Sequence, residues 1–230
     1  MTETAKSAAE KSVENASRQR LLVGASLIAI IASAVCIYHF EFRTNAANKE
    51  LHHAVGLALA DETARVIGHH GNIVLVTMDA RNSPELKLQL EAFEKDLKTI
   101  GGMSIKDKVV LDPGENPKFR PGSGLSAKRF LKIARKHPSA DAIVSFVGAP
   151  ELSEQDLVQV KTSPKLIAEA HSPEKLVDLL TKKILVAAIV PRFEFPAPGP
   201  RKPQTSRQWF DHYFQILTPD SILPAADNSP

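Results

Sequence analysis

The chain has 230 residues, 43% of them hydrophobic, and 29 Lys+Arg against 26 Asp+Glu give it a formal net charge of +3. Charges this evenly balanced, with no basic block to supply phosphate contacts, give no support for a nucleic-acid partner. The one cysteine, Cys36, excludes an intrachain disulfide and a zinc site built from cysteines.

An uncharged apolar stretch is the first element of the chain. Residues 21–40 contain no Asp, Glu, Lys or Arg. A helix of this length, rising about 1.5 Å per residue, covers the roughly 30 Å hydrocarbon core of a bilayer. The stretch therefore predicts one transmembrane helix with the lipid bilayer as its partner. A cleaved signal peptide is the alternative, because residues 32–34 read Ala-Ser-Ala, the small-x-small form of a peptidase site.

Basic residues before this stretch predict its orientation. They are Lys6, Lys11, Arg18 and Arg20. Because positive charge stays on the cytoplasmic side, we expect residues 1–20 to lie in the cytoplasm. Their polar composition predicts a disordered tail. The part after a linker at 41–50 then lies outside. The predicted location is the inner (cytoplasmic) membrane, crossed once, with a periplasmic or extracellular C-terminal domain.

Helical and strand-like patterns alternate through residues 51–192. Apolar residues at helical spacing predict helices at 50–67 and 84–100, the second with Ser83 as N-cap and Gly101 after its end. Short apolar runs predict five strands, and weaker patterns predict the other helices. The strands are 73–76, 109–111, 142–147, 165–170 and 185–190; the other helices are 126–137, 153–157 and one that follows Ser172.

This alternation predicts the fold class. Strands separated by helices require right-handed parallel crossovers. We therefore expect an α/β fold, a three-layer αβα sandwich with a mainly parallel five-stranded sheet, preceded by the one transmembrane helix. Residues 193–230 form a separate proline-rich segment and aromatic tail, because PRFEFPAPGPRKPQ is too dense in proline for a helix or a central strand.

Several blocks of the sequence resemble a known family. GNIVLVTMDARNSPELKLQLEAFEKDLKTIGG is followed by ARKHPSADAIVSFVGAPEL, KLIAEAHSPEKLVDLLTKKILVAAIVPR and QILTPDSI. Over residues 51–192, and in QILTPDSI as a final strand-like segment, these blocks resemble the C-terminal lobe of type 1 periplasmic sugar-binding proteins, the relatives of ribose-binding protein and of the ligand-binding domains of lactose-repressor-like regulators. The resemblance implies a lobe that helps to hold a sugar and closes on it by hinge motion.

The polar anchors that the resemblance implies are missing. The family binds sugar hydroxyls with an Arg, an Asn-Asp pair, an Asp and a Gln. The corresponding positions here hold Lys87 or Gln89, Val147-Gly148, Ala170 and Pro191. Apolar or absent side chains cannot replace charged and amide hydrogen bonds in a mostly dry cleft. The departures favour a lobe that has lost its sugar.

Candidate ligand-binding residues nevertheless lie where open α/β sheets bind ligands, at the carboxyl edge. Asp79, Arg81 and Asn82 follow the first expected strand, Gly148 follows the third and His171 the fourth. They could bind a small polar ligand. Turn chemistry and helix capping explain the Asp and the Asn equally well, and His171 also fits a loop position beside a helix cap.

No pattern of an enzyme or a metal site is present in the sequence. The pairs His52-His53 and His69-His70 lack a carboxylate to complete a metal cage. The glycine-rich run at 120–124 lacks the phosphate-loop pattern, and no serine has the G-x-S-x-G frame. We therefore predict no metal, no cofactor and no catalytic activity.

The chain's densest aromatic cluster is in the tail: Trp209, Phe210, Tyr213 and Phe214. Such a patch either folds back onto its own sheet edge or marks an interface with another chain. We expect association, as a homodimer or with an envelope protein.

Two function classes stay open. One is a membrane-anchored, extracytoplasmic, solute-binding-protein-like domain acting as a non-catalytic interaction or assembly module. The other is a small-molecule, sugar-like binding or sensing module of a transport or signalling system. The missing anchors favour the first.

Overall fold

A computed structural model describes residues 30–33, 49–112, 124–160, 164–192 and 203–222. The chain divides into two units, Met1–Asn48 and Lys49–Pro230. In the first unit the described residues 30–33 are helical and exposed. Within the described ranges, no helix combines the length and the apolar character needed to cross a membrane. The rest of the span expected at 21–40 lies outside those ranges, so that span stays a prediction.

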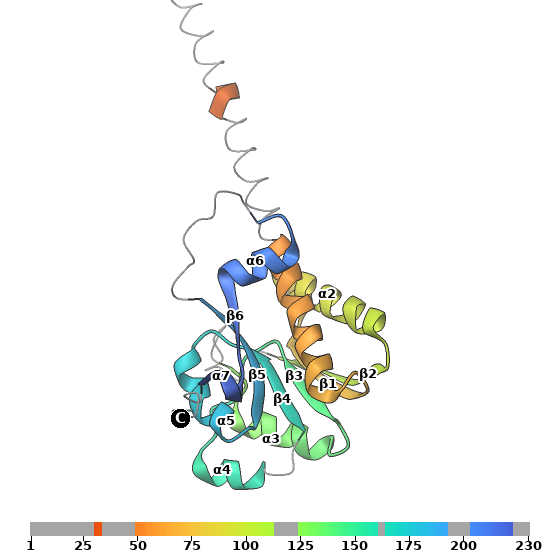
Figure 1. Ribbon diagram of the computed structural model, residues 1–230, viewed down its shortest axis with the longest axis vertical. Helices are drawn as coiled ribbons and strands as arrows, with labels where there is room; N and C mark the ends of the chain where they lie inside the picture. Colours follow the sequence, from red (N-terminus) through yellow and green to blue (C-terminus); the bar gives the residue numbers. More distant parts are fainter. Residues whose placement is uncertain (1–29, 34–48, 113–123, 161–163, 193–202, 223–230) are drawn as a thin grey trace, which may run out of the picture. The chain divides into compact units, whose positions relative to one another are not determined.

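One six-stranded sheet organises the second unit (Figure 1), in the order β2-β1-β3-β4-β5-β6. The strands are β1 (Gly71–Met78), β2 (Met103–Leu111), β3 (Ala142–Ser145), β4 (Lys165–Glu169), β5 (Leu185–Pro191) and β6 (Phe214–Leu217). Strands β1 to β5 are parallel, and β6 pairs antiparallel with β5. The α/β class and the mainly parallel sheet are confirmed. The expected number of five strands is wrong, because β6 adds a sixth.

Helices cover both faces of this sheet. One face carries a helix over residues 49–67, α2 (Pro84–Ile100) and α6 (Ser206–Tyr213). The other face carries α3 (Ala127–Lys136), α4 (Glu154–Gln159), α5 (Val177–Thr181) and α7 (Pro219–Ile222). Two 3-10 turns, η1 (Ala80–Asn82) and η3 (Pro173–Leu176), follow strands β1 and β4.

The central strands are apolar without interruption because both of their faces are covered. In β1, Val74 and Val76 belong to the apolar core under α3 and α5, whereas Ile73 and Leu75 belong to the core under the 49–67 helix and α2. All four are fully buried. A continuous apolar run is the pattern of a parallel strand inside a three-layer fold.

Helix α2 begins and ends where its sequence predicts. The Ser83 hydroxyl accepts a hydrogen bond from the Leu86 N–H at 3.3 Å, and Gly101 at the other end has a φ of +75°, which favours glycine. The helix buries Phe93 completely, with its ring edge-on to Phe146 at 5.4 Å between centroids. This packing fixes which side chains α2 presents to the sheet.

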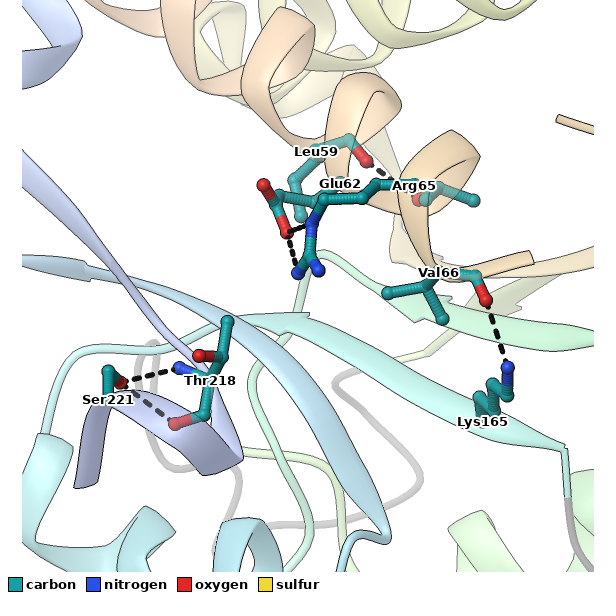
Figure 2. A network of polar contacts seen from close by, with 8 residues as sticks. Leu59, Glu62, Arg65, Val66, Lys165, Thr218 and Ser221 are labelled. Carbon is teal, nitrogen blue, oxygen red and sulfur yellow. Dashed lines mark hydrogen bonds and ion pairs between the residues drawn. The ribbon is translucent and has the colours of Figure 1, made fainter. Parts of the chain in front are cut away.

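The 49–67 helix lies unusually close to α2. At Gly56, a Cβ atom would overlap the main-chain oxygen of Gln89 and would lie 2.8 Å from the Ala92 Cβ. At its other end, the carbonyl of Val66 accepts a hydrogen bond from the ammonium group of Lys165 at 2.9 Å (Figure 2). The helix is therefore held against both α2 and the start of β4.

The two edge strands differ from the sequence-based expectation. Strand β2 begins at Met103, well before the expected 109–111, and its residues alternate between half-buried and exposed. This period of two is typical of a strand with one covered face. The central strands, which are covered on both faces, instead have a continuous apolar run. Strand β6 extends the sheet into the segment that the sequence set apart as a tail.

Candidate functional site

The predicted ligand-binding residues meet at one edge of the sheet. Asp79 follows β1, Gly148 lies three residues after β3, and His171 lies two residues after β4. Because β1, β3 and β4 are adjacent and parallel, these residues share the carboxyl edge. Arg81 and Asn82 belong to η1, which begins one residue after Asp79. His171 is exposed there.

Asp79 and Arg81 bind each other. The Arg81 guanidinium donates hydrogen bonds to both carboxylate oxygens of Asp79, from Nε at 3.0 and 2.8 Å and from Nη2 at 2.5 Å, and the Arg81 main-chain N–H donates a fourth at 3.0 Å. The Arg81 side chain holds the pKa of Asp79 at about 2. This is an aspartate-centred turn that opens η1, and it pairs the Asp79 carboxylate with an Arg81 side chain that is 87% exposed.

Gly148 has a packing role. Its φ is +101°, and a Cβ atom there would lie 2.7 Å from the Cα of Gly124. Its carbonyl accepts a hydrogen bond from the Ser145 hydroxyl at 2.7 Å. The loop after β3 and the segment that begins α3 thus meet backbone to backbone, further joined by a bridge between Ser126 and Glu151. Glycine is required at this contact because any side chain would separate the two loops.

A polar cluster that the sequence analysis did not single out lies at the same edge. The side-chain amide nitrogen of Gln89 lies 3.2 Å from a carboxylate oxygen of Glu169 and 3.3 Å from Nδ1 of His52. Gln89 comes from α2, Glu169 ends β4, and His52 lies in the 49–67 helix. Gln89 is only 5% exposed, so three elements meet around one buried amide.

Burial shifts the titration of the two ionisable members of this cluster. It raises the pKa of Glu169 to about 7, and the hydrogen bond from Gln89 opposes that shift only partly. Burial also lowers the pKa of His52, against a smaller opposing effect of Glu85. A neutral His52 can accept the Gln89 hydrogen bond at Nδ1. The side-chain NH2 group of Gln89 therefore has two acceptors within the chain when His52 is neutral.

Signals for this cluster exist in the sequence, but they are indirect. Gln89 is one of the two residues, with Lys87, that the sequence analysis set against an anchor of the resembled family, and Glu169 is the one acidic residue in the apolar run of β4. What the sequence cannot show is their proximity, because the partners lie 37 and 80 residues from Gln89.

The aromatic tail folds back onto its own sheet. Phe210 is 2% exposed in the core under the 49–67 helix, and Trp209 and Phe214 pack against that core. The ring of Trp209 stacks on Tyr213 at 5.8 Å between centroids and 9° between planes. Of the two outcomes considered for this cluster, packing on its own sheet edge is the one observed. Association through the exposed parts of Trp209 and Tyr213 stays a prediction.

Metal-ligating side chains do not gather in the described part of the chain. There, no group of three or more His, Cys, Asp or Glu side chains is arranged to hold a metal ion. In that part, His52 is engaged with Gln89, and His70 with the main-chain oxygen of Gly68 at 3.3 Å.

Comparison with known proteins finds similarity in fold alone. No protein-family model matches the chain, and no curated protein matches it in sequence. GanP, a glucose-galactose binding protein from Geobacillus stearothermophilus, is 11% identical, with a TM-score of 0.48 over 75% of this chain and 62% of its own. A chain of a XylFII–LytSN complex is 14% identical, with a TM-score of 0.48 over 74% of this chain and 61% of its own.

A third similar structure is the fructose-binding periplasmic domain of a hybrid two-component system, 14% identical, with a TM-score of 0.44 over 60% of this chain and 45% of its own. The chain thus resembles periplasmic sugar-binding proteins over part of its length and spans 45% to 62% of these three chains. Likeness at this level says nothing about a ligand or a partner.

Proposed function

We propose that the chain is a membrane-anchored, non-catalytic recognition domain of the extracytoplasmic side, which acts through contacts with another protein. The observation that carries the proposal is the internal use of the polar groups at the carboxyl edge. Gln89 is hydrogen-bonded to Glu169 and His52, and Asp79 is paired with Arg81. The predicted span at 21–40 supplies the anchor.

A sugar would have to compete with these internal hydrogen bonds. Sugar sites present donors and acceptors that are free to meet hydroxyl groups. Here the Gln89 amide is buried and already shared between two partners, so a hydroxyl that binds it must first break an existing bond worth about 0.5–1.5 kcal/mol net. Gly148, which packs on Gly124, also offers no side chain to a ligand.

The partner surface that we propose is the exposed side of α6. Trp209 and Tyr213 remain partly exposed on this helix, with their rings stacked on each other. Aromatic residues are enriched in the centres of protein interfaces, because they bury large areas at a small cost in side-chain entropy. The buried Phe210 fixes α6 against the sheet, so the surface is rigid before it binds.

Site-specific photo-cross-linking in the native membrane tests this proposal. A photoreactive phenylalanine analogue in place of Trp209 should give one discrete adduct. The same residue in place of Lys98, which is exposed on α2, should give none. An adduct of twice the chain's mass would identify a second copy as the partner. Absence of an adduct at 209, or the same adducts at 98, would contradict the proposal.

Small-molecule sensing is the second candidate, and one observation favours it. Glu169 lies at the edge where open α/β sheets bind ligands, and its pKa of about 7 leaves it able to donate or accept a hydrogen bond near neutral pH. In that case a polar ligand would displace His52 from Gln89. Ligand binding would then be weakened by Glu169→Gln and would depend on pH around 7.

A further inference from the structure

A cavity of about 490 Å³ lies at the opposite edge of the sheet from the cluster around Gln89. It is bounded by the first residue of β4, Lys165, and by Ile184, which directly precedes β5. The amino ends of parallel strands share one edge, so this cavity is separate from the carboxyl edge. Its lining residues are Glu154, Leu157, Val158, Val160, Pro164, Lys165, Lys182, Lys183 and Ile184.

The lining combines an apolar part with a basic part. Leu157, Val160, Pro164 and Ile184 are half-buried or buried side chains that line it. Val158 lies beside them and is 67% exposed, one of the few large apolar side chains of the domain left so open. Lys182, Lys183 and Glu154 supply the charge, which leaves the cavity with an excess of positive charge, whereas the Lys165 ammonium is bound to the Val66 carbonyl on the other face of the sheet.

The lysines differ in what they already bind. Lys182 lies 3.6 Å from a carboxylate oxygen of Glu154. Lys165 donates to the Val66 carbonyl at the end of the 49–67 helix (Figure 2). Within the described ranges, the Lys183 ammonium has no hydrogen-bond or ion-pair partner, although the Lys183 main chain is held by a hydrogen bond to the Leu180 carbonyl at 2.9 Å. Lys183 is therefore the cation that is available to a ligand.

These features select one kind of ligand. Ammonium groups donate hydrogen bonds and accept none, so the cationic rim matches an anion better than it matches a neutral polyol. The apolar lining gains from covering a hydrocarbon or aromatic body. The volume falls in the range of about 300–1,000 Å³ that small-molecule sites occupy.

We infer that this cavity binds a small amphipathic anion. The ligand's carboxylate meets Lys183 at the rim, with Lys182 close by, and its apolar body lies against Leu157, Val160 and Ile184. The site is independent of the α6 surface and of the Gln89 cluster.

Calorimetric titration of the full chain in lipid nanodiscs tests the inference with a defined probe pair. Naphthalene-2-carboxylate is the anion, and naphthalene-2-carboxamide is its neutral analogue of nearly equal shape. We expect saturable binding of the carboxylate and at least about tenfold weaker binding of the amide, a difference of about 1.4 kcal/mol. Raising the salt concentration should weaken carboxylate binding and leave amide binding unchanged, because screening acts only on the charged probe.

Variants locate the binding. Lys183→Gln should weaken carboxylate binding about tenfold without changing amide binding, whereas Lys98→Gln on the distant α2 helix should change neither. Leu157→Ser should weaken both probes, because it removes part of the apolar lining. Equal thermal midpoints for wild type and Lys183→Gln would show that the fold is intact.

Two results would overturn the inference: no saturable binding of the carboxylate to the wild type, or binding that Lys183→Gln and Leu157→Ser leave unchanged. Neither result bears on the cross-linking at Trp209, so the two proposals fail separately.

Discussion

Replacing Glu169 by Gln removes the ionisable group at the end of β4 and keeps an oxygen that can accept the hydrogen bond from Gln89. Burial raises the pKa of Glu169 from 4.5 to about 7. The folded chain therefore keeps a proton that the unfolded chain releases. Stability from this group is fully present below pH 4.5 and is lost as the pH rises through about 7.

The size of this loss follows from the shift. One pKa unit corresponds to about 1.4 kcal/mol, so the wild type should lose up to about 3 kcal/mol of unfolding free energy between pH 4.5 and pH 8 because of Glu169. The Glu169→Gln variant does not have this loss. It should be close to the wild type in stability at pH 4.5 and clearly more stable at pH 8.

Urea denaturation of the full chain, followed by the fluorescence of its single tryptophan, Trp209, measures the difference. His52, whose pKa burial lowers, acts in the opposite sense, since its contribution is lost as the pH falls. The test therefore uses the difference between variant and wild type at each pH. Glu91→Gln, on the exposed side of α2, is the control. The reasoning would be refuted if the unfolding free energies of Glu169→Gln and the wild type differed by the same amount at pH 5 and at pH 8.

Three further predictions concern the fold and the anchor. Phe93→Ala should cost about 3–5 kcal/mol, because the ring is fully buried; Lys95→Ala should cost almost nothing, and equal urea midpoints for the two would contradict the packing of α2. Gly148→Ala should destabilise the domain far more than Gly68→Ala, because both have positive φ but only Gly148 faces another backbone within 3 Å; similar losses in thermal melts would contradict that contact. N-terminal sequencing of the membrane-extracted protein should find residues 21–40 still attached, and a start within or after them would show that they are a cleaved signal.

Local sequence patterns were sufficient to predict the helices and strands whose formation depends on residues close to one another in the chain. The Ser83 cap, the spacing of Leu86, Leu90, Phe93 and Leu97, and Gly101 place α2 almost to the residue. The apolar run at 185–190 places β5 within one residue, and the run at 73–76 marks the middle of β1, which extends two residues further at each end. These signals work because capping and amphipathic burial are decided within one turn or one strand.

Elements at the edges of the sheet were harder to predict. The MSIKDKVVL sequence of β2 alternates polar and apolar residues, and only its last three residues form an apolar run. Strand β6 has four residues, all half-buried, and it depends on pairing with β5 across a proline-rich connection. Its strand conformation is determined by that partner, which no local pattern can reveal.

The candidate site shows the same limit. The residues Asp79, Gly148 and His171 could be placed at one edge, because each follows a predicted parallel strand. Their roles could not be predicted, since Asp79 binds Arg81 and Gly148 packs on Gly124. The cluster around Gln89 depends on how the 49–67 helix crosses α2 at Gly56, and that crossing is a result of tertiary packing.

The central claim is that the carboxyl edge does not bind sugars, because Gln89 is hydrogen-bonded to Glu169 and His52 and because Asp79 is paired with Arg81. Calorimetric titration of the full chain in nanodiscs with glucose, galactose and fructose, sugars named for two of the structurally similar proteins, tests it most directly. We predict no saturable heat with any of them at millimolar concentrations. Saturable binding of one sugar to the wild type, weakened by Gln89→Ala and unchanged by Lys98→Gln, would contradict the claim.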